Sequence, residues 1–346
     1  MIIRFQPGTT AADVQAVRER LESEGVRTIL SPESARPIFA AVDKVPPTLQ
    51  AEIESNERVE STVTPKGAWR LAARSFREAP SVADIGGVRL GAGEVSIIAG
   101  PCSVDHLMEE AAIQVRRGGA HILRGGAYKP RTSPYSFQGF GKEGLRKLKD
   151  AGEKVGLPVV SEIMDAAHVG PFVEHDIDCL QVGARNMQNF TLLKAIAQVG
   201  KPVLLKRGLA ATVDEWLYSA EYLLAGGCQG VVLCERGIRT FETATRNTLD
   251  LTILPLLREI THLPVVVDPA HAAGIASLIT PLSRASVAVG ADGIAVEVHP
   301  DPSQARSDAD QALLEGELVQ IVAEARVMAA VTGRRLHAQP RIPDKA

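Results

Sequence analysis

The sequence predicts an α/β protein in which a small α+β domain of the ferredoxin-like kind precedes a (β/α)8 TIM barrel. From residue 95 onward, eight short apolar runs are each followed by a segment of helical periodicity. The runs are apolar almost throughout, as parallel strands are when helices cover both faces of their sheet. Roughly 240 residues hold these units, which is a typical length for such a barrel. Residues 1–65 instead follow the order β-α-β-β-α-β of a split βαβ sandwich.

Residues 1–65 are expected to form the first domain, with a regulatory or oligomerisation role. Its strands are predicted at 2–5, 26–30, 37–42 and 59–63, and its helices at 9–24 and 48–55. Thr10 offers a hydroxyl as a helix cap, and Gly25 is a typical stop signal. Residues 66–94 are expected to connect the two domains and to form a hairpin around Gly86 and Gly87 at the bottom of the barrel.

The barrel is predicted to span residues 95–335, followed by a C-terminal tail at 336–346. Its strands are expected at Val95–Ala99, His121–Arg124, Pro158–Ile163, Cys179–Val182, Pro202–Lys206, Gly230–Cys234, Pro264–Val267 and Gly293–Val298. An open, doubly wound sheet is the structural alternative, but the glycine-rich phosphate fingerprint expected after its first strand is missing. A barrel predicts that functional side chains gather at the C-terminal ends of the strands.

The composition argues against nucleic-acid and membrane partners. Asp and Glu outnumber Lys and Arg by 41 to 38, so there is no basic excess, and aromatic residues make up only 4%. No apolar stretch reaches the ~18 residues of a membrane span, and residues 1–8 show no secretory leader. The cysteines are scattered without a CxxC pair, which is typical of reduced thiols in a cytoplasmic protein; they are Cys102, Cys179, Cys228 and Cys234.

A first group of candidate site residues is cationic and follows the predicted strands. It consists of Arg124, Lys129, Arg131, Arg185, Lys206 and Arg236. These cations would repel one another at one barrel mouth unless an anion binds between them, and Arg and Lys are the side chains that grip phosphate and carboxylate. The alternative is that each pairs with a neighbouring acid such as Glu162, Glu235 or Asp268. We expect a site for polyanionic substrates.

A second group suits a divalent metal ion. Cys102, His271 and Glu297 follow or end predicted strands, and Asp308 comes shortly afterwards. A thiolate, an imidazole and two carboxylates form a mixed ligand set for a first-row metal, and these residue types do not choose among zinc, iron, manganese and cobalt. Taken singly, Cys102 is equally compatible with a small buried hydrophobe, and His271 with a hydrogen-bonded core imidazole.

The motifs around these residues resemble those of the 3-deoxy-D-arabino-heptulosonate 7-phosphate (DAHP) synthases. The matching segments are Ala99-Gly100-Pro101-Cys102-Ser103, the runs Gly125 to Ser133, Gly183 to Asn189 and Arg236 to Asp250, and Glu297-Val298-His299-Pro300. The resemblance covers essentially the whole chain, and it is closest to the branch with a short barrel and an N-terminal ferredoxin-like domain. Members of this family open the shikimate pathway, which leads to the aromatic amino acids.

The resemblance implies a transferase that condenses phosphoenolpyruvate with erythrose 4-phosphate and water and releases phosphate, with one divalent metal ion as cofactor. It implies Cys102, His271, Glu297 and Asp308 as the metal ligands. It implies Arg124, Lys129, Ala184, Arg185, Lys206 and Arg236 for phosphoenolpyruvate, and Arg131 with Thr132 for the phosphate of the aldose. Besides Cys102 and His271, the catalytic residues would be Lys129, holding or delivering a proton, and Glu162, positioning the attacking water.

Two positions depart from the family pattern. Ala270 stands before His271 where a serine is usual, which removes a hydroxyl beside the ligand but not the ligand itself. Ala309 stands after Asp308 where a glycine is usual, so Asp310 is a rival for the last metal ligand, although the register favours Asp308.

Other functions share some of these features. A 3-deoxy-D-manno-octulosonate 8-phosphate synthase has the same barrel and mechanism but takes arabinose 5-phosphate. Pro130, where that enzyme usually carries Asn, and the N-terminal domain both favour the four-carbon aldose. A Schiff-base aldolase would use Lys129 or Lys206 as nucleophile and would work without a metal. A phosphometabolite sensor, which is not an enzyme, would bind without turnover and would not need four metal ligands.

The resemblance also implies protein-level regulation. It suggests a homotetramer, and it suggests an aromatic amino acid as an effector of the N-terminal domain. Such an effector would act by docking this domain over the barrel mouth, which shifts the population between open and closed states.

Overall fold

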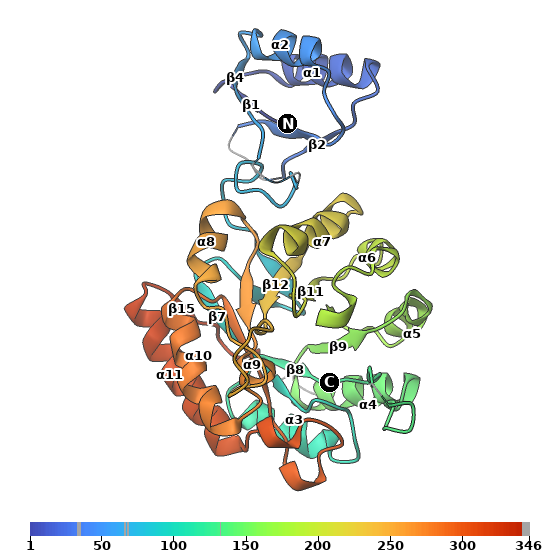
Figure 1. The fold of residues 1–346 in the computed structure, drawn as a ribbon, viewed down its shortest axis with the longest axis vertical. Helices are drawn as coiled ribbons and strands as arrows, with labels where there is room; N and C mark the ends of the chain where they lie inside the picture. The colour runs from blue at the N-terminus through green and yellow to red at the C-terminus, as the bar shows by residue number, and fades with distance from the viewer. Residues whose placement is uncertain (33–35, 66, 68, 132, 341–346) are drawn as a thin grey trace, which may run out of the picture. The chain divides into compact units, whose positions relative to one another are not determined.

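The structure, a computed structural model, describes residues 1–346 except 33–35, 66, 68, 132 and 341–346. Two compact units make up the chain (Figure 1). The first comprises Met1–Ser81 with Leu256–His262, and the second comprises Val82–Pro255 with Leu263–Ala346. Residues 66 and 68 of the expected connection and residues 341–346 of the expected tail lie outside the described residues.

The first unit follows the order β-α-β-β-α-β. Its elements are β1 (Ile2–Phe5), α1 (Ala11–Ser23), β2 (Thr28–Leu30), β3 (Ile38–Ala41), α2 (Pro47–Glu54) and β4 (Val59–Val63). The strands form an antiparallel sheet in the order β2-β3-β1-β4, and Leu21 and Ile53 of the helices share one core with Phe5 and Phe39 of the sheet. This sheet confirms the predicted α+β fold of the N-terminal region.

A β-hairpin fills the bottom of the barrel in the second unit. β5 (Ala83–Ile85) and β6 (Val88–Leu90) pair antiparallel around Gly86 and Gly87, whose φ angles are 56° and 87°. A two-residue hairpin turn with positive φ at both positions favours glycine at each of them. The apolar side chains of the hairpin lie in one core cluster with strand residues such as Ile98 and Ile122. The barrel interior is therefore a packed core at this end.

The eight parallel strands of the second unit close on themselves. They are β7 (Glu94–Gly100), β8 (Ile122–Arg124), β9 (Val159–Ile163), β10 (Cys179–Val182), β11 (Val203–Lys206), β12 (Val231–Glu235), β13 (Val265–Val267) and β14 (Gly293–Glu297). Neighbouring strands pair in sequence order, and β14 pairs with β7 to close the circle, with Glu297 beside Gly100. This closure confirms the (β/α)8 barrel and rules out the open sheet.

Helices cover the outside of this barrel (Figure 1). They are α3 (Met108–Arg117), α4 (Lys142–Val155), α5 (Val169–Glu174), α6 (Phe190–Ala197), α7 (Val213–Ala225), α10 (Ala276–Ala288) and α11 (Glu315–Val331). Two more helices are α8 (Ile253–Ile260), whose residues divide between the two units, and the short α9 (Pro269–Ala273), which follows β13. After α11, β15 (Arg335–Leu336) adds to the first residues of β7. Among the described residues, no helix combines the length and the apolar character that a membrane crossing needs.

Long connections lie at the C-terminal ends of several strands. Residues 125–141 follow β8, residues 236–252 follow β12, and residues 298–314 follow β14. Each carries basic side chains, among them Lys129, Arg131 and Arg246. Because the C-terminal ends of all the parallel strands meet at one face of a barrel, these connections reach the same mouth.

Candidate active site

A cavity of about 210 Å³ lies at the C-terminal mouth of the barrel. It is lined by Cys102, Lys129, Pro130, Arg131, Glu162, Gly183, Ala184, Arg185, Lys206, Leu209, Arg236, Arg239, Arg246, Asn247, His271 and Asp308. Most of the sequence-predicted site residues are thus brought together. Arg124 and Glu297, which are 6% and 1% exposed, lie behind this lining. Thr132 lies outside the described residues.

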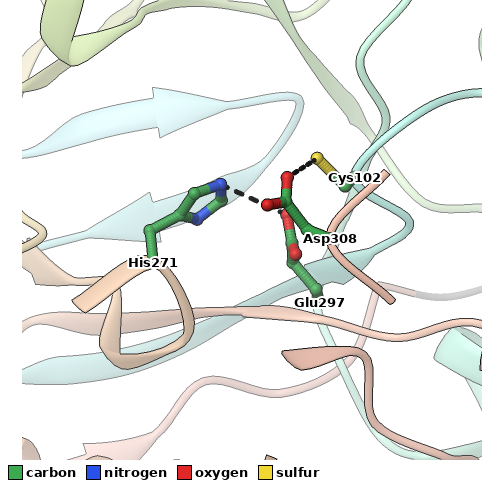
Figure 2. Close-up of side chains that lie close together, drawn as sticks. All are labelled: Cys102, His271, Glu297 and Asp308. Carbon is green, nitrogen blue, oxygen red and sulfur yellow. Dashed lines mark hydrogen bonds and ion pairs between the residues drawn. The ribbon is translucent and has the colours of Figure 1, made fainter. Parts of the chain in front are cut away.

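The four predicted metal ligands form one cluster (Figure 2). One potential ligand atom from each of Cys102, His271, Glu297 and Asp308 lies within 4.8 Å of the others. Cys102 follows β7, His271 lies in α9 after β13, Glu297 ends β14, and Asp308 precedes a short 3₁₀ turn at Ala309–Gln311. The rival Asp310 is exposed and is not part of this group.

The backbone of Asp308 is left-handed, with φ 52° and ψ 40°. A non-glycine residue in this conformation costs about 1 kcal/mol or more and persists only where the surroundings impose it. Here the carboxylate is held on both sides: Oδ1 accepts from Arg246 at 2.8 Å, and Oδ2 accepts from the Cys102 thiol at 2.9 Å. Such strain is typical of functional sites.

The protonation pattern of the cluster fits a bound cation. Asp268 Oδ2 lies 2.8 Å from His271 Nδ1, and burial lowers the pKa of His271, so the neutral ring donates from Nδ1. Its Nε2 then turns a lone pair toward Glu297 Oε1, which is only 3.3 Å away. Two acceptors that face each other repel unless a cation lies between them. Burial also raises the pKa of the Cys102 thiol to about 12, and a coordinating metal ion deprotonates such a thiol outright.

Each of these side chains is held from behind by a further polar group. Lys129 Nζ donates to both Sγ and the carbonyl oxygen of Cys102, at 2.9 Å each. Arg124 Nη1 lies 3.0 Å from Glu297 Oε1. Burial by itself would raise the pKa of Asp268, but His271 and Lys206 together hold it well below its usual range. The cluster is therefore preorganised, with a sulfur, a nitrogen and carboxylate oxygens directed at one point.

The structure divides the predicted cations into paired and unpaired side chains. Lys206 Nζ lies 2.5 Å from Asp268 Oδ2, and Arg124 pairs with Glu297, so each of these two cations has a carboxylate partner. Glu235 instead pairs with Arg207, 2.9 Å away. In the part of the chain that the structure describes, the remaining predicted cations enter no ion pair, and all of them line the cavity; they are Lys129, Arg131, Arg185 and Arg236.

Arg236 is the strongest candidate for an anion-binding group. Its side chain is only 5% exposed, and within the described residues its Nη1 has no hydrogen-bond partner. Buried polar groups in folded proteins are almost always hydrogen-bonded, so an unpartnered guanidinium N–H beside a cavity indicates an absent ligand. A phosphate or carboxylate would supply the missing acceptor.

Glu162 also belongs to the cavity lining. Its Oε2 accepts from Gln181 at 3.1 Å. A Cβ at Gly183 would lie 2.1 Å from Glu162 Oε1, so only glycine lets this carboxylate occupy its place. Ala184 and Arg185 follow directly in a 3₁₀ turn, Ala184–Asn186. Gly183, which directly follows β10, therefore leaves the space that the Glu162 carboxylate occupies.

Sequence reasoning missed several residues of the cavity. Leu209, Arg239, Arg246 and Asn247 line it but were not predicted as site residues. Only side chains at or just after a strand end were selected, whereas three of these four lie further along the connection after β12. The basic residues of that connection were the available signal.

Comparison with known proteins identifies the family of this chain. Residues 66–330 match the model of the DAHP synthetase I family. This chain belongs to that family. The resemblance predicted from its motifs is therefore confirmed.

Relatives match over nearly the full length. The phospho-2-dehydro-3-deoxyheptonate aldolase of Thermotoga maritima is 43% identical over 339 residues, covering 97% of this chain and 100% of that protein. The crystal structure of the Thermotoga maritima phospho-2-dehydro-3-deoxyheptonate aldolase (DAHP synthase) superposes with a TM-score of 0.76 at 42% identity, covering 97% of this chain and 98% of that one. The 2-dehydro-3-deoxyphosphooctonate aldolase of Desulfotalea psychrophila is 31% identical over 266 residues, 70% of this chain and 94% of that protein.

Proposed function

We propose that this chain is a metal-dependent 3-deoxy-7-phosphoheptulonate synthase. It joins phosphoenolpyruvate, erythrose 4-phosphate and water into DAHP and inorganic phosphate, the first step of the shikimate pathway. The observation that carries this proposal is one cavity in which a Cys-His-Glu-Asp cluster lies beside unpaired cations. The full-length relative of Thermotoga maritima, which bears the name of this activity, supports it.

The reaction joins two anions, so binding and orientation are the main tasks of the protein. Carbon 3 of phosphoenolpyruvate forms a bond to the aldehyde carbon, water adds its oxygen to carbon 2, and the bond from carbon 2 to the phosphate oxygen breaks. Orientation of this kind supplies ~7–11 kcal/mol of barrier reduction. A bound manganese, iron, cobalt or zinc ion would supply Lewis acidity toward the aldehyde oxygen.

We assign the cations by their place in the cavity. Arg185 and Arg236 hold the phosphate and carboxylate of phosphoenolpyruvate, together with Lys206 and Lys129. Arg124 acts from behind the cavity through Glu297. Arg131 takes the phosphate of the aldose; Thr132, its expected partner, lies outside the described residues.

Lys129 and Glu162 are the proposed proton-handling residues. Lys129 is buried with its Nζ against Cys102, and Glu162 lies in the same cavity lining. A lysine that reaches the reacting centre can deliver a proton to the aldehyde oxygen as it becomes a hydroxyl. A carboxylate on the other side can accept a proton from the attacking water.

The test is the loss of the phosphoenolpyruvate enol absorbance by purified, metal-stripped protein. Erythrose 4-phosphate and arabinose 5-phosphate are compared, each with and without added Mn²⁺. We expect loss with erythrose 4-phosphate only, and only with metal. Loss with arabinose 5-phosphate would move the protein to the octulosonate branch. Loss without metal and borohydride trapping would support the Schiff-base aldolase, and binding without turnover would support the sensor.

We further propose that residues 1–65 form a regulatory domain that binds an aromatic amino acid. A cavity of about 440 Å³ in the first unit supports this, since it combines the apolar Val14 and Phe39 with the basic Arg18 and Arg36. An aromatic ring and a carboxylate would each find a partner there. Removal of residues 1–65 should abolish inhibition by tyrosine or phenylalanine; inhibition that survives the truncation contradicts the proposal.

The proposed assembly is a homotetramer in the cytoplasm. The tetramer is what the resemblance of the motifs implies, and the four cysteines, all free and buried, support a reducing compartment. Light scattering of the purified protein measures the assembly directly.

A further inference from the structure

Gln311 lies directly behind the metal cluster and has no role in the proposed function so far. It closes the 3₁₀ turn that begins after Asp308, and its side chain is only 2% exposed. Its Nε2 donates to Glu297 Oε2 at 2.6 Å, and its Oε1 accepts from Arg246 Nη1 at 3.1 Å. The amide therefore connects a metal-ligand candidate with a cation.

The two partners fix which way the Gln311 amide points. A carboxylate only accepts hydrogen bonds, and a guanidinium only donates them. A flipped amide would set oxygen against the Glu297 carboxylate and N–H against the Arg246 guanidinium, so both bonds would be lost. The orientation is thus determined by chemistry, and the bond to Glu297 is short because its acceptor is charged.

This bond decides which oxygen of Glu297 faces the cluster. Oε2 is occupied by Gln311, whereas Oε1 lies 3.3 Å from His271 Nε2 and 3.0 Å from Arg124 Nη1. Apart from a half-turn that exchanges its two equivalent oxygens, the carboxylate cannot rotate without breaking its bonds to Gln311 and Arg124 and leaving a buried charged oxygen unpaired. Glu297 is therefore held with a single oxygen toward His271.

Arg246 joins the same arrangement to the other carboxylate. Its Nη1 donates to Asp308 Oδ1 at 2.8 Å as well as to Gln311 Oε1. Glu297 comes from the end of a strand, whereas Asp308 comes from an irregular connection with a left-handed backbone. A hydrogen-bonded path through Gln311 and Arg246 thus ties together two ligand candidates that no regular element connects.

We propose that Gln311 is a positioning residue of the metal site, which presents Glu297 through one oxygen and is itself oriented by Arg246. The proposal rests on the metal site of the proposed function. Removal of a group that orients a metal ligand lowers metal affinity by about 10–100-fold. Because Gln311 does not line the substrate cavity, the KM for phosphoenolpyruvate at saturating metal should stay within about twofold.

The experiment measures Co²⁺ binding to the metal-stripped full-length protein by titration of the visible absorption spectrum. Gln311→Met removes both polar atoms at nearly the same length, and Gln311→Leu also excludes a thioether as a replacement ligand. The matched control is Gln320→Met, a glutamine on the exposed face of α11 whose Nε2 bonds Glu324 at 3.0 Å. We expect the Co²⁺ Kd to rise about 10–100-fold in both Gln311 variants and to stay unchanged in the control.

The spectrum gives a second reading, because the d–d bands of Co²⁺ weaken as more oxygens coordinate. A Glu297 freed from Gln311 can offer both oxygens, so the bands of the Gln311 variants should lose intensity at saturating Co²⁺. A Kd within threefold of the wild type and an unchanged spectrum in both variants would overturn the proposal. A large drop of the metal-free melting temperature in both would also overturn it, since Gln311 would then serve the fold. Failure of the wild type to bind Co²⁺ would instead refute the metal site itself.

Discussion

The buried carboxylate of Asp268 offers the sharpest test of how the metal and substrate sites depend on each other. It is fully buried and accepts from Lys206 Nζ at 2.5 Å, from the backbone N–H of His271 at 2.9 Å and from His271 Nδ1 at 2.8 Å. Asp268→Asn keeps the size of the side chain but removes its charge. Lys206, itself only 4% exposed, would then be left as a buried ammonium without a counter-charge.

The magnitude follows from these contacts. Breaking a buried ion pair by neutralising one partner costs about 3–5 kcal/mol of folding free energy. The amide oxygen that Asp268→Asn introduces would still accept a hydrogen bond. We therefore expect the free energy of unfolding to fall by an amount near the lower end of that range, about 3 kcal/mol. The Nδ1 proton of His271 loses a charged acceptor as well, and metal affinity should fall about 10–100-fold.

The assay combines urea denaturation at pH 8 with a metal titration. The matched control is Asp178→Asn in the same barrel, because Asp178 accepts from the N–H of Val159 at 2.8 Å and lies 3.4 Å from Lys149, away from the metal cluster. Asp178→Asn should lower the free energy of unfolding by about 1 kcal/mol and leave the metal Kd unchanged. If Asp268→Asn changes the unfolding free energy by less than about 1 kcal/mol and the Kd by less than threefold, the coupling argued here is wrong.

Three further predictions follow from single contacts. Lys129→Met should lower turnover by ~10²-fold or more with an unchanged melting temperature, whereas retention of most activity would remove Lys129 from the mechanism. Gly183→Ala places a Cβ 2.1 Å from Glu162 Oε1 and should cost on the order of 10²-fold in kcat, against no effect from Gly170→Ala, where the added Cβ meets open space. Burial lowers the pKa of His262 from 6.5 to about 4, so the unfolded chain takes up a proton that the folded chain refuses. Stability is then full above pH ~6.5 and falls by about 2 kcal/mol from pH 7.5 to 5; His262→Gln should remove this part of the slope in urea denaturation, and an unchanged slope would refute it.

Much of the fold could be read from local pattern. The apolar runs that became β7 to β14 are buried on both faces, so their composition and short length together separate them from helices and turns. Strand order then places every strand end at one mouth, which is why Cys102, His271 and Glu297 could be grouped although they lie far apart in the chain. The short motifs around these residues predicted the family to which the chain belongs.

Contacts between side chains from different helices, strands and connections could not be predicted from the sequence. Nothing local distinguishes Arg236, whose guanidinium lacks a partner in the described part of the chain, from Arg124, which pairs with Glu297. Gln311 gave no signal either, because its importance lies in the side chains that it contacts. The sequence by itself determined the alternation of strands and helices, the family and the residue types of the site, since these depend on periodicity and short motifs. The closure of β14 on β7, which distinguishes the barrel from an open sheet, came from the structure. Only the tertiary structure decided which charges are paired and that Glu297 turns a single oxygen toward His271, because those energies arise from distances of about 3 Å between residues distant in sequence.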